Sequence, residues 1–159
     1  MNRKTHLIVV LGALIAGCDG NLDSIDGHHL GEPESVIYGT NESGHTMMVM
    51  SDLPFLCDAV RSADPPARHD FWVLSTWTHV DADVPGKYTV DSYISVTDNG
   101  SVHEYETEAG VLDIHNLSLN HIKSQIDLSF STGDKISAEV TGTLCNANLF
   151  VGLKLGEFQ

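Results

Sequence analysis

The stretch KYTVDSYISVTDNGSVHEYETE, residues 87–108, decides the fold class. Its first half, residues 87–97, alternates apolar and polar side chains, with Tyr88, Val90, Ile94 and Val96 on one side. A period of two is typical of a strand with one buried face. The Asp-Asn-Gly sequence at 98–100 predicts a tight turn, because glycine adopts the positive φ that such turns need. The stretch therefore predicts two antiparallel strands joined by a hairpin turn.

The same pattern of strands and turns continues in both directions along the chain. Further strands are predicted at 35–40, 46–51, 70–80, 110–118, 121–131, 135–145 and 148–155. The one predicted helix is short, at residues 53–61 around Cys57, and Pro65-Pro66 closes it. About seven to nine strands at this spacing predict an all-β domain, either an antiparallel β-sandwich or a small barrel.

Length and charge limit the classes of function. The chain has 159 residues, which suits one domain. Eight Lys and Arg residues against 22 Asp and Glu residues give a formal net charge of −14 at pH 7. Binding to nucleic acid depends on clustered basic side chains that neutralise phosphates, so this composition argues against a nucleic-acid partner.

The N-terminus has the pattern of a bacterial export signal. Arg3 and Lys4 precede the apolar run LIVVLGALI at residues 7–15, followed by Ala16-Gly17-Cys18. The run is too short to cross the membrane as a helix, which needs about 20 residues, and it fits the core of a signal peptide. Residues 15–18 resemble the lipobox of bacterial lipoproteins. The resemblance implies that residues 1–17 are removed and that Cys18 is acylated.

An acylated Cys18 predicts a protein held in the bacterial cell envelope by covalent lipid, since two or three acyl chains anchor durably. Whether the membrane is the inner or the outer one, and whether the domain lies in the periplasm or at the surface, stays open. Residues 18–33 are rich in Gly, Asp and Asn and are interpreted as a flexible acidic linker, with the adjacent histidines 28 and 29 as part of it. The folded domain is expected at residues 34–159.

Two cysteines, Cys57 and Cys145, remain in the mature chain. An even number of thiols in an exported protein predicts a disulfide between them. A Cys/His metal site is the weaker alternative, because no C-x-x-C pair is present. Strict alternation puts Cys145 opposite Ile136 and Val140. Either the disulfide lies outside the core, or a bulge near Gly142 shifts the register.

The order of these features resembles a group of small lipoproteins of myxobacterial-type Gram-negative bacteria. The similar segments include residues 53–57, 84–90, 110–112 and 132–137, together with the terminal Cys145. The resemblance covers nearly the whole mature domain and implies a two-cysteine β-sandwich without an assigned activity.

The sequence contains no recognisable catalytic motif. It lacks Gly-x-Ser-x-Gly and His-Glu-x-x-His, and no cofactor-binding pattern is present. The acidic row at residues 104–108 is interpreted as a solvated face. Asp81 and Asp83 are weak candidates for binding calcium. Trp72 and Trp77 have opposite parity on one strand and are weak candidates for stacking on a sugar or peptide.

These observations favour a non-enzymatic structural or interaction module, tethered to a membrane through Cys18. Its expected partner is another envelope protein or a surface component. The alternative is a lipoprotein that binds a small ligand, a glycan or calcium.

Overall fold

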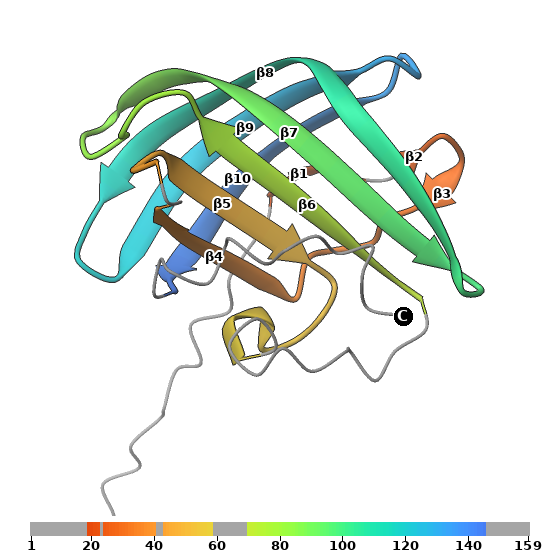
Figure 1. The fold of residues 1–159 in the computed structure, drawn as a ribbon. Coiled ribbons are helices and arrows are strands. Elements are labelled where there is room, and N and C mark those ends of the chain that lie inside the picture. Colours follow the sequence, from red (N-terminus) through yellow and green to blue (C-terminus); the bar gives the residue numbers. More distant parts are fainter. Residues whose placement is uncertain (1–18, 23, 41–42, 59–69, 146–159) are drawn as a thin grey trace, which may run out of the picture.

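The computed structural model describes residues 19–22, 24–40, 43–58 and 70–145. Within these ranges the chain is almost entirely β-strand, with one short helical turn at residues 56–58. The strands curve around a common interior, and the helical turn lies outside them (Figure 1). The prediction of an all-β fold with one short helix near Cys57 is confirmed.

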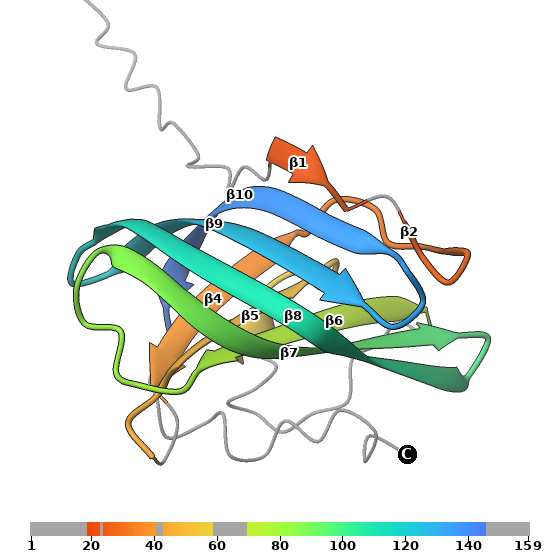
Figure 2. The same cartoon turned by 90° about the horizontal axis from the view of Figure 1, so that it is seen from above.

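Ten strands are present in the described residues. They are β1 (Asp19–Asn21), β2 (Ser24–Ile25), β3 (His28–His29), β4 (Ser35–Thr40), β5 (Thr46–Ser51), β6 (Phe71–Thr78), β7 (Gly86–Asp98), β8 (Ser101–Leu117), β9 (His121–Phe130) and β10 (Lys135–Leu144). β2 and β3 form a small separate hairpin, and β1 pairs antiparallel with β10 along the edge that β9 does not occupy (Figure 2).

The strands from β4 to β10 close into a seven-stranded barrel. Each pairs antiparallel with the next, and β10 then pairs with β4 in parallel, at Thr143↔Ile37 and Leu144↔Tyr38. When each strand is antiparallel to the one before it and the number of strands is odd, the first and the final strand run in the same direction. Of the two predicted architectures the barrel is therefore the one observed, and its pairing is antiparallel except at this one seam.

Alternating side chains fill the barrel. On β9 and β10 every second residue is buried, as expected when successive side chains point to opposite faces of a sheet. The inward row of β9 includes Ile126, Leu128 and Phe130, each at most 2% exposed. The interior is thus packed with side chains along these strands.

β8 is one long strand where the sequence predicts two, at residues 101–108 and 110–118. Its pairing with β9 shifts register between Thr107 and Ala109, so a β-bulge takes the place of the expected break. Gly110 follows the bulge and is buried between Val90 and Leu128. The glycine marks a close approach of neighbouring strands and does not end the strand.

A second, smaller apolar cluster lies on the outer face of β4, β5 and β6. Ile37, Val49 and Val73 point outward there and pack against Leu53, Leu56 and Cys145. This cover explains why β6 is buried on both faces.

The predicted disulfide between Cys57 and Cys145 is present, with a Cα–Cα distance of 5.7 Å. Cys145 is fully buried in the outer cluster. The pairing of β10 with β9 runs without a register shift from Lys135 to Thr143. Of the two alternatives for Cys145, the disulfide outside the barrel interior is correct, and no bulge near Gly142 is needed.

The segment predicted as a flexible linker is packed instead. Leu22, Ile25 and Leu30 are at most 6% exposed and belong to the same apolar cluster as the barrel interior. The β2–β3 hairpin lies across the end of the barrel where β7 turns into β8 (Figures 1 and 2). We call residues 22 and 24–31 the plug, because three buried side chains tie this segment to the core. The linker prediction is therefore wrong over the plug.

Several expectations fall outside the described residues. These are the signal peptide at residues 1–17, Cys18, the helix beyond residue 58 and the strand at 148–155. Among the residues that are described, no helix is long and apolar enough to span a membrane.

Candidate functional site

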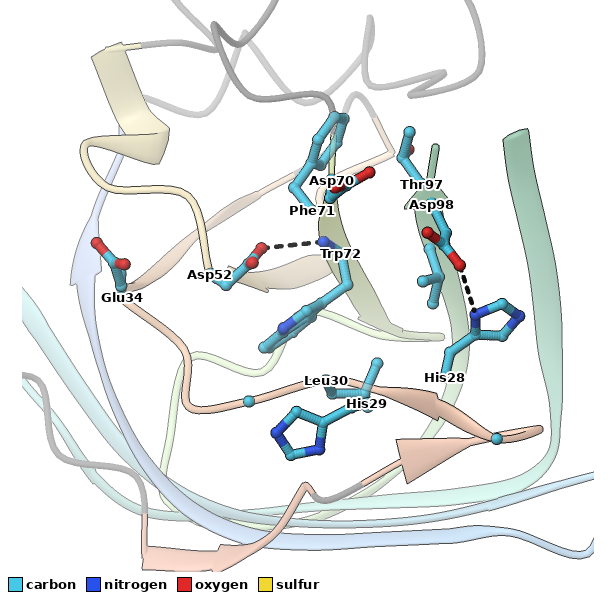
Figure 3. Close-up of a pocket in the computed structure, with 13 residues that line it drawn as sticks. His28, His29, Leu30, Glu34, Asp52, Asp70, Phe71, Trp72, Thr97 and Asp98 are labelled. Carbon is cyan, nitrogen blue, oxygen red and sulfur yellow. Dashed lines mark hydrogen bonds and ion pairs between the residues drawn. The ribbon is translucent and has the colours of Figure 1, made fainter. Parts of the chain in front are cut away.

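A pocket of about 480 Å³ opens at the plugged end of the barrel (Figure 3). Its wall comes from the plug, from the residue before β4 and the residue after β5, from the start of β6 and from the end of β7. The lining residues are Gly27, His28, His29, Leu30, Gly31, Glu34, Asp52, Asp70, Phe71, Trp72, Val96, Thr97 and Asp98. The volume falls within the range of about 300–1,000 Å³ that small-molecule sites occupy.

Strand pairing brings the acidic side chains of the pocket together. Phe71 pairs with Thr97, so Asp70 and Asp98 lie side by side where β6 begins and β7 ends. The backbone N–H of Asn99 donates to Asp70 Oδ1 at 2.7 Å, and the Asn99 Nδ2 donates to Asp98 Oδ1 at 2.7 Å. One turn residue therefore holds both carboxylates in place.

Asp52 and Trp72 form the third side of the pocket. β5 ends at Ser51, which pairs with Val73, and this register puts the next residue, Asp52, beside Trp72. The backbone N–H of Trp72 donates to Asp52 Oδ1 at 2.9 Å. Ser51 Oγ donates to the backbone oxygen of Trp72 at 2.6 Å. Both polar backbone groups of Trp72 therefore have partners, which holds its backbone at the pocket wall.

The indole of Trp72 carries a buried polar group of this site that is left unsatisfied. The residue is 2% exposed, and its ring reaches from β6 toward His29 and Leu30 (Figure 3). Among the described residues, its Nε1–H is a buried donor without a hydrogen-bond partner. A buried donor without a partner costs roughly 1–3 kcal/mol. An acceptor that reaches Nε1 through the pocket would recover part of that free energy.

The pocket is acidic and carries no Lys or Arg among its described lining residues. Four carboxylates and two histidines contribute to the wall. His28 Nδ1 lies 3.8 Å from Asp98 Oδ2, an ion pair whenever the histidine is protonated. Like-charge repulsion therefore disfavours an anionic ligand here.

Contacts with β8 and the β9–β10 turn hold the plug that forms one wall. The Tyr105 hydroxyl donates to Asp26 Oδ2 at 3.2 Å, and the Asp26 N–H donates to Asp134 Oδ2 at 2.8 Å. The rings of His28 and His103 lie 4.5 Å apart. Burial, followed by the hydrogen bond to Asp26, raises the pKa of Tyr105. The N–H of Asp26 and the Thr132 hydroxyl lower the pKa of Asp134.

Of the two tryptophans singled out in the sequence, Trp72 lines the pocket and Trp77 does not. Their opposite parity is present in β6: Trp72 belongs to the barrel core, whereas Trp77 is half-buried near the other end of the strand. Asp81 and Asp83 are exposed in the loop after β6, at the opposite end of the barrel from the pocket. Within the described ranges no group of three His, Cys, Asp or Glu side chains is placed to hold a metal ion.

The remaining acidic side chains singled out in the sequence lie on the outer surface. Glu104, Glu106 and Glu108 are exposed along β8, and burial together with Glu104 and Glu106 raises the pKa of the neighbouring Tyr93. Elsewhere on the barrel wall, Glu139 pairs with Lys123 at 2.6 Å and with His115 at 4.0 Å. These are solvated ion pairs of a sheet surface and do not converge on the pocket.

Sequence reasoning missed Asp52, Asp70 and Asp98 as site residues. Each lies directly at the end of a strand, and all three strand ends meet at one end of the barrel. The available signal was this shared position at strand ends, which becomes informative only once the strand order is known.

Comparisons with models of protein families, with curated proteins and with solved structures found no match to this chain.

Proposed function

We propose that this chain is a lipid-anchored protein of the bacterial cell envelope that binds a small ligand in the pocket at the plugged end of its barrel. The observation that carries the proposal is the pocket itself, whose volume, fixed carboxylates and unsatisfied indole N–H suit a bound molecule. The tether rests on the lipobox resemblance at residues 15–18.

Binding without chemistry fits the state of the pocket residues. Asp52, Asp70 and Asp98 each accept a hydrogen bond that organises a strand end or a turn. Carboxylates held in this way are fixed acceptors, which favours recognition of a ligand over proton transfer. A concave site of this size favours a small ligand, or a short part of a surface polymer, over the flat face of a partner protein.

Changing Cys18 to Ser tests the tether. We expect the wild-type protein to partition into the detergent phase and the variant into the aqueous phase, because serine cannot receive the thioether-linked lipid that would anchor the protein. The measurement is Triton X-114 partitioning of membranes from a Gram-negative host. Gly20→Ser, a serine placed two residues away, should leave the partitioning unchanged. Detergent partitioning that survives Cys18→Ser would show that the anchor is wrong.

Changing Thr97 to Trp tests the pocket. Thr97 lines the pocket but alternates with the inward-facing Val96, so a larger side chain there adds bulk at the rim of the pocket without entering the core. We expect at least one compound from a panel of sugars, amines and amino acids to raise the Tm of the wild type, by mass action on the folded state, and to lose that effect in Thr97→Trp.

The matched control for this experiment is Thr89→Trp on the same strand, exposed and away from the pocket. It should keep the Tm response of the wild type. If no compound stabilises the wild type, or if Thr97→Trp responds as strongly as Thr89→Trp, ligand binding in this pocket is refuted.

A further inference from the structure

We infer that the ligand of this pocket is a neutral sugar, which accepts a hydrogen bond from Trp72 Nε1–H and donates hydroxyls to Asp70 and Asp98. The inference rests on the proposed function and adds to it the chemical class of the ligand. It is carried by two independent observations, a buried indole donor without a partner and a pair of fixed, exposed carboxylates in the same wall.

The indole requires an acceptor from the ligand. Indole Nε1–H is a donor only, and the Trp72 residue is 2% exposed. An acceptor delivered by the ligand would therefore meet little competition from bulk water. Because Asp70 and Asp98 line the same pocket, this acceptor has to be uncharged: a hydroxyl or an amide carbonyl oxygen, not a carboxylate or a phosphate.

The carboxylates require donors from the same ligand. Asp70 and Asp98 each use Oδ1 toward Asn99, but an ionised carboxylate offers about four acceptor positions. Further hydrogen bonds can therefore form on the pocket side. Such bonds to a charged acceptor are the stronger kind, worth about twice a neutral pair.

A sugar meets both requirements, whereas a simple amine meets only one. An amine would donate to the carboxylates and leave the Trp72 N–H without an acceptor. A sugar hydroxyl both donates and accepts, so one sugar carries both kinds of partner. Phe71, Leu30 and Val96 add apolar surface for the C–H face of a sugar ring.

The direct test is NMR of the two indole N–H groups in the full mature chain, with Cys18→Ser to keep it in solution. The probes are glucose and N-acetylglucosamine, with putrescine as the amine for comparison. Trp77→Phe assigns the Trp72 resonance. We expect both sugars to shift the Trp72 indole resonance in a saturable manner and to leave that of Trp77 in place.

The variant Trp72→Phe removes the N–H and keeps an aromatic ring. It should weaken binding of the better sugar by about 2- to 12-fold, the range for one neutral hydrogen bond, as measured by calorimetry. Trp77→Phe is the matched control and should bind as the wild type does. Because the NMR experiment is done on protein that keeps Trp72, it still tests the inference if Trp72→Phe does not fold.

Three results would overturn the inference. They are a Trp72 resonance that neither sugar shifts, sugar binding of equal strength in Thr97→Trp, and a response to putrescine alone. If other panel compounds still stabilise the wild type and not Thr97→Trp, the sugar is wrong and the pocket remains a binding site. If no compound does, the proposed function fails as well.

Discussion

Loss of the Cys57–Cys145 disulfide is expected to lower the free energy of unfolding by about 4.5 kcal/mol on the chain-entropy model. The bond closes a loop across a sequence separation of 88 residues. Without it, the unfolded chain gains the freedom that this loop had removed. The total stability of such a domain is about 5–15 kcal/mol, so the reduced protein should be marginal at 37 °C.

The contacts of the disulfide in the folded state also predict a loss of stability when it is removed. Cys145 is fully buried against Ile37, Val49 and Leu56 on the outer face of the barrel. The bond therefore joins the cover of β4–β6 to the end of β10, at the parallel seam that closes the barrel. Removing it releases the cover and the seam together.

The measurement is urea unfolding of the Cys18→Ser protein, with and without reductant, and of the same protein carrying Cys57→Ala and Cys145→Ala. The reductant-treated protein and the double alanine variant should both unfold at a much lower urea concentration than the oxidised protein. Reductant is the internal control, because it should not change the unfolding of the double alanine variant. A difference below about 1 kcal/mol between oxidised and reduced protein would contradict the expectation.

Local patterns in the sequence predicted most strands but not how they close. The strands at 35–40 and 46–51 match β4 and β5 residue for residue, because alternation and turn residues are local signals. The parallel contact of Thr143 with Ile37 joins residues far apart in the chain. No local pattern reports such a contact, so the choice between sandwich and barrel stayed open.

The plug shows a second limit. Its three buried side chains, Leu22, Ile25 and Leu30, are scattered among Gly, Asp and Asn, and its strands are two residues long. A strand that short has no measurable period. Composition therefore indicates a linker, while the barrel end supplies the apolar surface that orders the segment.

The candidate site was predictable only in part for the same reason. Parity showed that Trp72 and Trp77 face opposite sides of β6, but the inner side is defined by barrel closure. Asp52, Asp70 and Asp98 looked like ordinary residues at strand ends. They become a site because three strand ends and the plug meet at one end of the barrel.

Changing Gly110 to Val is expected to destabilise the fold by about 3 kcal/mol, at the upper end of the usual cost of overpacking a core. A Cβ at this position would lie 2.8 Å from Val90 Cγ2 and 2.9 Å from Leu128 Cδ2. It would also lie 2.9 Å from the backbone oxygen of Val90. The side chains can rotate away, but that oxygen belongs to a paired strand and cannot move without opening the barrel wall.

Ala109→Val is the matched control for this prediction, since it places the same side chain on the neighbouring, exposed position of β8. Surface changes of this kind usually stay within about 0.5 kcal/mol. Urea unfolding of both variants separates the steric cost from any general effect of valine in this strand. Equal stability of the two variants would mean that β7 and β9 can spread around residue 110. The close approach of the strands at Gly110 would then not require a glycine.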